Sequence, residues 1–149
     1  MSAGIGDLVQ TSLNLGVLRT EKDSVLSTFC VRSSVDSEKE ELIERLSEVM
    51  EVLSGTISLS GIYPGWEYRE ESKLRDVMTT VYRELYGKDM VVYAIHAGVE
   101  CGLFCGAIKD LDAVSIGPDM KDIHTTSETL DIGSVQRSWD YLLAVLARL

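Results

Sequence analysis

The chain has 149 residues, a formal net charge of −10 at pH 7, 45% apolar residues and 26% charged residues. This length allows one domain with a sizeable core, and the balance of residues excludes a disordered or low-complexity chain. The acidic charge argues against nucleic acid and anionic membrane surfaces as partners, because like charges repel.

The sequence also predicts a cytoplasmic location. No apolar run approaches the roughly 20 residues that a membrane-spanning helix needs. The first ten residues lack the basic and then apolar pattern of a secretion signal. Three cysteines, an odd number without the spacing of a disulfide framework, suit a reducing compartment.

The first third of the chain predicts a β-hairpin. The segments Leu8–Arg19 and Val25–Ser33 are rich in Val, Leu, Thr and Phe, as strands are. Between them, residues 20–24 form a polar turn. The two strands are therefore expected to pair with each other.

A helix and a further strand are expected after the hairpin. Asp36 or Ser37 can cap a helix whose first turn is acidic, and its apolar residues recur at helical spacing. Gly55 ends this helix, and Thr56–Ile62 alternates as a strand does. The order β-β-α-β is that of half a ferredoxin-like α+β sandwich.

The turn residues at Tyr63–Trp66 predict a domain boundary. The part that follows alternates between helix and strand, which predicts a parallel sheet and an α/β fold class. The expected elements are a helix over Leu74–Leu85 closed by Gly87, a strand over Val91–Ile95, a helix over Val99–Ile108, a strand over Ala113–Ile116, a polar loop over Gly117–Leu130 and a final helix capped by Ser134.

The two histidines are the first candidates for chemistry. His96 follows the expected strand Val91–Ile95, and His124 lies in the polar loop. Loops at the carboxyl ends of parallel strands are where α/β sheets place their sites. His124, which Glu128 follows closely, could be a metal ligand, a general base or a solvated loop residue.

The segment after His96 has two interpretations. Gly98 and Gly102 flank Glu100 where a helix begins, which leaves backbone N–H groups free for a ligand or simply gives the turn room. Cys101 and Cys105 share a helix face, and with His96 they could imitate a zinc site. A structural zinc takes four ligands, so buried thiols acting as small apolar groups are favoured.

Two polar residues stand out in the hairpin. Arg32 ends an otherwise apolar strand, and Asn14 lies in the strand that faces it. The guanidinium could be a surface group or a bidentate fork for a carboxylate.

Segments along nearly the whole chain resemble the aminoacylhistidine (Xaa-His) dipeptidases, members of a dinuclear-zinc exopeptidase family that includes carnosinases and aminoacylases. The segments are TSLNLGVL (Thr11–Leu18), VRSSVDS (Val31–Ser37), YPGW (Tyr63–Trp66), IHAGVECG (Ile95–Gly102), SIGPD (Ser115–Asp119) and HTTSE (His124–Glu128). No single motif decides, but the ordered set is specific.

The resemblance implies where the chain lies in the family fold. Residues 1–62 would be the second half of the ferredoxin-like lid, or dimerisation, domain. Residues 63–149 would be the C-terminal segment of the zinc-binding α/β catalytic domain. This division agrees with the boundary that composition predicts.

The resemblance also implies roles for single residues. His124 would be the final zinc ligand, and Glu128 would orient its loop or accept a hydrogen bond from the imidazole. Arg32 would clamp the C-terminal carboxylate of a dipeptide. Asn14 would steady its carbonyl or the developing oxyanion.

The segment from His96 to Gly102, with Gly98, would line the substrate pocket, and Glu100 would hold the α-amino group. One departure from the family is that Thr125-Thr126 follows the histidine, where the family tends to have Ser-Pro. The departure leaves the proposed ligand in place.

The family's other catalytic residues have no match in the sequence. The two zinc ions of the family need a His-x-Asp segment, a bridging aspartate, a Glu-Glu pair that contains the general base and a further aspartate. One histidine cannot hold two zinc ions. The chain is thus expected to be part of a dipeptidase that hydrolyses Xaa-His peptides with a zinc-activated hydroxide, and to be inactive alone.

Two alternatives stay open. The chain could be a non-catalytic binding or self-association module derived from such a peptidase. An unpaired sheet edge would make it a homo-oligomer under either interpretation. A free-standing α/β protein with a Cys-His metal site is the third possibility.

Overall fold

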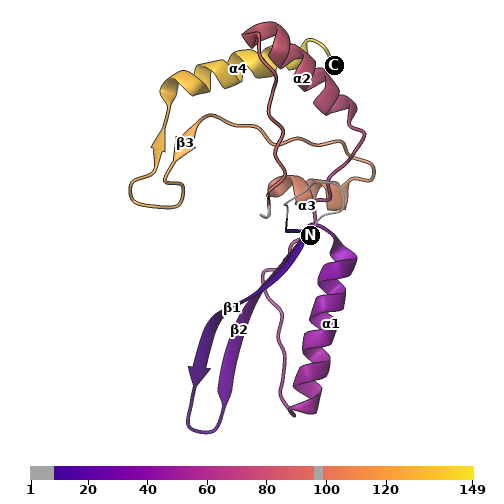
Figure 1. Ribbon diagram of the computed structural model, residues 1–149, viewed down its shortest axis with the longest axis vertical. Coiled ribbons are helices and arrows are strands. Elements are labelled where there is room, and N and C mark those ends of the chain that lie inside the picture. Colours follow the sequence, from indigo (N-terminus) through magenta and orange to yellow (C-terminus); the bar gives the residue numbers. More distant parts are fainter. Residues whose placement is uncertain (1–8, 96–98) are drawn as a thin grey trace. The chain divides into compact units, whose positions relative to one another are not determined.

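A computed structural model describes residues 9–95 and 99–149 (Figure 1). Its elements are β1 (Thr11–Thr20), β2 (Val25–Ser33), α1 (Asp36–Val52), α2 (Lys73–Tyr86), α3 (Glu100–Ala107), β3 (Met120–Lys121), β4 (Thr129–Leu130) and α4 (Ile132–Leu146). Two compact units contain them: β1, β2, α1 and α3 lie in the first, and α2, β3, β4 and α4 in the second. The mixture of helices and strands confirms the predicted α/β class.

The predicted hairpin is confirmed, and its two faces differ. β1 and β2 pair antiparallel from Thr11 opposite Ser33 to Thr20 opposite Val25, with one irregularity at Gly16. Because side chains alternate across a strand, one face is mostly apolar and the other carries polar groups towards its base. The side chains of the apolar face are Leu13, Leu15, Leu18, Val25, Phe29 and Val31. α1 packs against β2.

The amino end of α1 is tied to the turn that contains Pro64 and Gly65. The Asp36 carboxylate accepts hydrogen bonds from the Gly65 N–H at 2.7 Å and from Lys39 Nζ at 2.5 Å. A Cβ atom at Gly65 would lie 2.4 Å from the Ser34 carbonyl oxygen, so only glycine fits there. The hydrogen bond from Lys39 is the main reason that the pKa of Asp36 is lowered from its ordinary value of 3.8.

Acidification is expected to release this contact between α1 and Gly65. A carboxylate whose folded pKa is depressed stabilises the fold above its ordinary pKa, and that contribution disappears as the pH falls through the lowered pKa. The Gly65 amide resonance, followed by NMR from pH 6 to pH 2, should titrate with Asp36. Asp36→Asn should remove the titration, and Glu44→Gln on the same helix should preserve it. A titration unchanged in Asp36→Asn would contradict the assignment.

The core of the second unit lies between α2 and α4. Its buried apolar side chains are Met78, Val81, Tyr141 and Val145. The Tyr141 hydroxyl donates to the Met78 carbonyl at 2.9 Å, and its ring meets that of Tyr82 edge-on at 5.7 Å. Burial raises the pKa of Tyr141 to about 12, so the hydroxyl is a neutral donor at physiological pH.

The end of α2 at Gly87 was predicted, whereas the start of α4 corrects the prediction. Ser72 caps α2 by accepting a hydrogen bond from the Arg75 N–H, and Gly87 closes it at a φ of 66°. The cap of α4 is Asp131, whose carboxylate accepts from the Ser134 N–H at 3.0 Å. Ser134 is therefore inside the helix, and its hydroxyl is available for other contacts.

Three predicted strands are wrong as paired elements. Residues 56–62, 91–95 and 113–116 have no strand partner among residues 9–95 and 99–149, and the two sheets described are antiparallel hairpins. A strand needs a neighbour to satisfy its backbone groups, and the described part of the chain places none beside these segments. Many of their apolar side chains are exposed, including Ile62, Val91 and Tyr93. The predicted parallel sheet is therefore not formed within the described chain.

No helix in the described ranges has the length and apolar character needed to cross a membrane.

Candidate functional site

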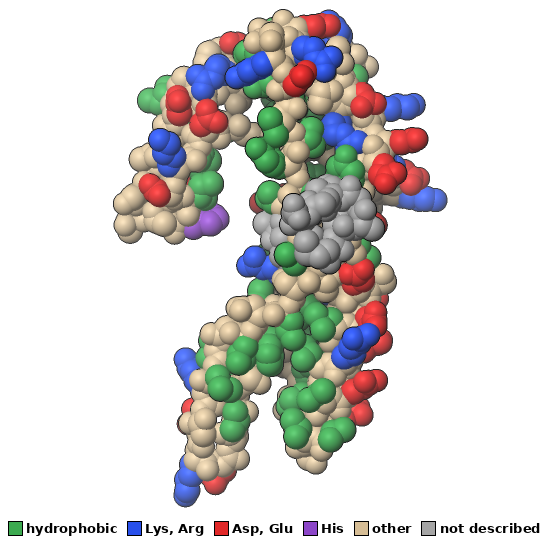
Figure 2. Space-filling view, viewed as in Figure 1, with side chains coloured by type: hydrophobic (Ala, Val, Ile, Leu, Met, Phe, Trp, Pro, Cys, Tyr) green, Lys and Arg blue, Asp and Glu red, His purple; other side chains and the backbone are tan. Residues whose placement is uncertain are grey.

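The polar face of the β1–β2 hairpin brings Asn14 and Arg32 together. Asn14 lies opposite Cys30, and Arg32 lies opposite Ser12, so all four side chains are on the same face. They line a depression of about 210 Å³. Figure 2 shows apolar side chains gathered along the hairpin and α1 on the face in view.

This depression has the groups that a carboxylate needs. The guanidinium of Arg32 is exposed, and no ion pair engages it among the described residues. Such a planar cation can bind a carboxylate through two parallel hydrogen bonds, and the nearby Asn14 amide can donate to a carbonyl oxygen. Asn14 was predicted to lie in the strand that faces the strand of Arg32, and the two strands do pair. Ser12 and Cys30 were missed, although the two-residue strand period would have found them.

The segment that begins α3 is described in part. His96 and Gly98 lie outside the described residues. Glu100 is exposed in the first turn of α3, where the helix dipole favours a carboxylate. Gly102 packs against the turn at Pro64, and a Cβ there would lie 3.2 Å from the Pro64 carbonyl oxygen. Close packing therefore accounts for Gly102.

His124 lies in the loop that joins β3 and β4. The two strands pair antiparallel as Met120 with Leu130 and Lys121 with Thr129. The imidazole-bearing residue is exposed and has a φ of 67°. For a residue other than glycine this left-handed conformation costs on the order of 1–3 kcal/mol, and such residues gather at functional sites.

Glu128 holds the His124 loop through the main chain. Its carboxylate accepts a hydrogen bond from the His124 N–H at 2.8 Å. Within the same loop, the Thr125 hydroxyl donates to the Asp122 carbonyl at 2.7 Å. Of the two roles expected for Glu128, the geometry therefore favours orientation of the loop.

The candidate residues are divided between the two units. Asn14, Arg32 and Glu100 belong to the first unit, whereas His124 and Glu128 belong to the second. Each set is therefore described within its own unit.

The described residues do not by themselves fit a dinuclear zinc centre. Within residues 9–95 and 99–149, no group of three or more His, Cys, Asp or Glu side chains could hold a metal ion. His124 offers one imidazole. The three cysteines form no disulfide among the described residues, and burial raises the pKa of Cys101, which does not favour the thiolate that zinc binds. The described chain thus gives no support to a Cys-His metal site.

Comparisons with known proteins point to peptidases. No family model matches the chain. It is 33% identical over 139 residues to the cytosol non-specific dipeptidase of Escherichia coli (strain K12), a match that covers 93% of this chain and 29% of that protein. It superimposes on the crystal structure of the aminoacylhistidine dipeptidase from Vibrio alginolyticus with a TM-score of 0.88 and 36% identity, over 100% of this chain and 30% of that one. The chain is therefore related to the aminoacylhistidine dipeptidases, as its motifs predicted, and spans less than a third of the length of these relatives.

Proposed function

We propose that the chain is the C-terminal part of a zinc metallodipeptidase that hydrolyses Xaa-His and related dipeptides, and that it does not hydrolyse them alone. The observation that carries the proposal is the match to a dipeptidase structure over the whole chain at 36% identity. A cytoplasmic location is part of the proposal, and the name of the Escherichia coli relative supports it.

In this proposal the hairpin binds the carboxyl half of the substrate. Arg32 clamps the C-terminal carboxylate and Asn14 donates to the carbonyl next to the scissile bond. The shared face of the two strands supports these two roles, because a cation and an amide line the same depression. Glu100, with His96 and Gly98, holds the α-amino end.

His124 contributes one imidazole to the metal centre in this proposal. Its exposure and its place in the HTTSE segment support this role. Its left-handed backbone is shared by Ser54, Asp110 and Asp122, so that conformation alone does not mark a ligand. The remaining zinc ligands and the general base have no counterpart in this sequence. Hydrolysis therefore requires residues from the other two-thirds of a dipeptidase.

The surface of the chain supports its being one part of a larger assembly. The chain exposes 11558 Å². Two separate compact domains of half its mass would together expose only about 9,000 Å². Strands β1 and β2 form a sheet of two strands, so each has an outer edge open among the described residues. This open hairpin favours the second candidate function, a non-catalytic module that binds peptides or pairs with another copy.

The isolated chain is expected to hydrolyse Ala-His no faster than buffer does, with or without added zinc. The measurement is product formation with a zinc-loaded dipeptidase as the positive control. Zinc-dependent hydrolysis that disappears in His124→Ala would contradict the proposal. Tight binding of Ala-His that requires Arg32 but gives no hydrolysis, with or without the rest of a dipeptidase, would favour the binding module.

A further inference from the structure

The loop that carries His124 is closed by a very short stem. β3 and β4 contribute two residues each, and so short a hairpin is marginal unless it is held from outside. Asp119 precedes β3 and Asp131 follows β4. These two residues are the feet of the loop, and the Asp131 N–H donates to the Asp119 carbonyl at 3.0 Å.

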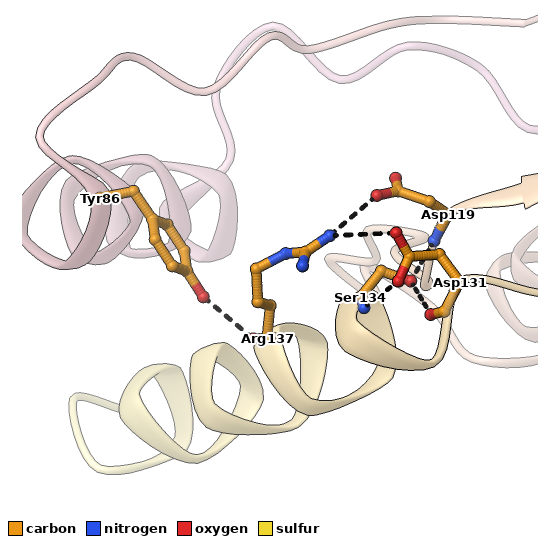
Figure 3. Close-up of polar contacts among 5 residues, drawn as sticks. All are labelled: Tyr86, Asp119, Asp131, Ser134 and Arg137. Carbon is orange, nitrogen blue, oxygen red and sulfur yellow. Dashed lines mark hydrogen bonds and ion pairs between the residues drawn. The ribbon is translucent and has the colours of Figure 1, made fainter.

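One buried hydroxyl joins both feet. The Ser134 side chain donates to the Asp131 carbonyl at 2.6 Å and accepts from the Asp119 N–H at 2.8 Å (Figure 3). Ser134 is 3% exposed, so these hydrogen bonds are shielded from water. The Asp131 carbonyl also accepts from the Ser134 and Val135 N–H groups, so the Asp119 N–H is the partner for which loss of the hydroxyl is costly. The Ser134 N–H also donates to the Asp131 carboxylate, so three of its contacts fix the base of the loop.

Neighbouring contacts add to the hydrogen bonds of Ser134 but do not replace them. Arg137 pairs with Asp119 at 3.1 Å and approaches Asp131 at 3.9 Å, but these side chains are more than half exposed and such pairs contribute little. Tyr86 donates to the Arg137 carbonyl at 2.9 Å and ties α4 to α2. The helix α4 is thus fixed against the core of the second unit, and the hydrogen bonds of Ser134 fix the loop to α4.

We propose that Ser134 is a positioning residue for His124: its hydroxyl fixes the feet of the β3–β4 loop and thereby the direction in which the imidazole is presented. The proposal deepens the function proposed above and takes from it the role of His124 as a metal ligand. The sequence does not reveal this role, because a serine near the start of a helix is expected to be its cap.

The test is residue-by-residue amide hydrogen exchange of the metal-free chain in three variants. Ser134→Ala is expected to raise the exchange of the Asp131 and His124 amides by about five- to a hundredfold relative to amides in the middle of α4. Ser134→Thr keeps the hydroxyl and should return the loop towards the wild-type rates. Ser72→Ala is the matched control, since Ser72 is also a buried serine at a helix start, 4% exposed, in the same unit.

The outcomes separate positioning from general stability. A loop-specific increase in Ser134→Ala, restored by threonine and missing in Ser72→Ala, is the expected result. An unchanged loop, or an increase spread evenly over α2 and α4 as in Ser72→Ala, would overturn the proposal. Because the exchange is measured without metal or peptide, failure of His124 as a zinc ligand would show in zinc affinity and leave this result untouched.

Discussion

His124→Ala is expected to lower dipeptidase activity by about a hundredfold or more in a hybrid enzyme. In this hybrid, the matching segment of the Escherichia coli dipeptidase, 29% of that protein, is replaced by this chain. Loss of a residue that merely supports a metal ligand costs about 10- to 100-fold, so loss of the ligand itself should cost at least as much. The measurement is kcat/KM for Ala-His together with zinc content.

A neighbouring substitution controls for damage to the loop. Thr126→Ala changes the same exposed loop two residues away and should leave kcat/KM within about threefold, as surface substitutions usually do. Equal losses in the two variants, or a His124→Ala hybrid that keeps full zinc content and activity, would show that His124 is not a metal ligand.

Tyr141→Ala is expected to destabilise the second unit by about 3–5 kcal/mol, the range for truncating a buried aromatic side chain. Tyr141 is 5% exposed at the centre of the small core between α2 and α4, and its hydroxyl satisfies the Met78 carbonyl. A unit of this size has little stability to spare. Its denaturant transition should therefore move to much lower concentration or disappear.

Leu143→Ala on the same helix is the matched control for this core. Leu143 is 47% exposed, so its truncation should cost less than about 1 kcal/mol. The measurement is urea denaturation followed by near-ultraviolet circular dichroism, which reports the packing of the tyrosine rings. Similar losses for Tyr141→Ala and Leu143→Ala would mean that the core does not lie between α2 and α4.

Local patterns predicted the elements whose partners are close in sequence. The β1–β2 hairpin needs only the turn between its strands, and α2 was found from its apolar stripe and Gly87. The segments 56–62, 91–95 and 113–116 have the composition of strands, but a strand also needs a neighbour to pair with. The composition of a segment does not show whether a neighbour exists, so composition alone predicted more strands than the described chain forms.

The candidate site divides in the same way. The hairpin predicted that Asn14 and Arg32 lie in neighbouring strands. Their place on one face depends on the register, which sets Asn14 opposite Cys30 and Arg32 opposite Ser12. The left-handed backbone of His124 could not be predicted, since no glycine or turn motif signals it. The role of Ser134 depends on Asp119 and Asp131, which lie on opposite sides of a loop and meet only in the folded unit. The division into domains 1–62 and 63–149 stays a prediction.

The most direct test of the central claim is the Ala-His hydrolase activity of the folded, zinc-loaded hybrid compared with that of the isolated chain. We expect zinc-dependent activity within about tenfold of the Escherichia coli parent for the hybrid and none above buffer for the chain alone, because in the proposed function the ligands and general base are split between the two parts. A hybrid that folds and holds zinc but does not hydrolyse Ala-His would contradict the proposed function, as would an isolated chain that is active.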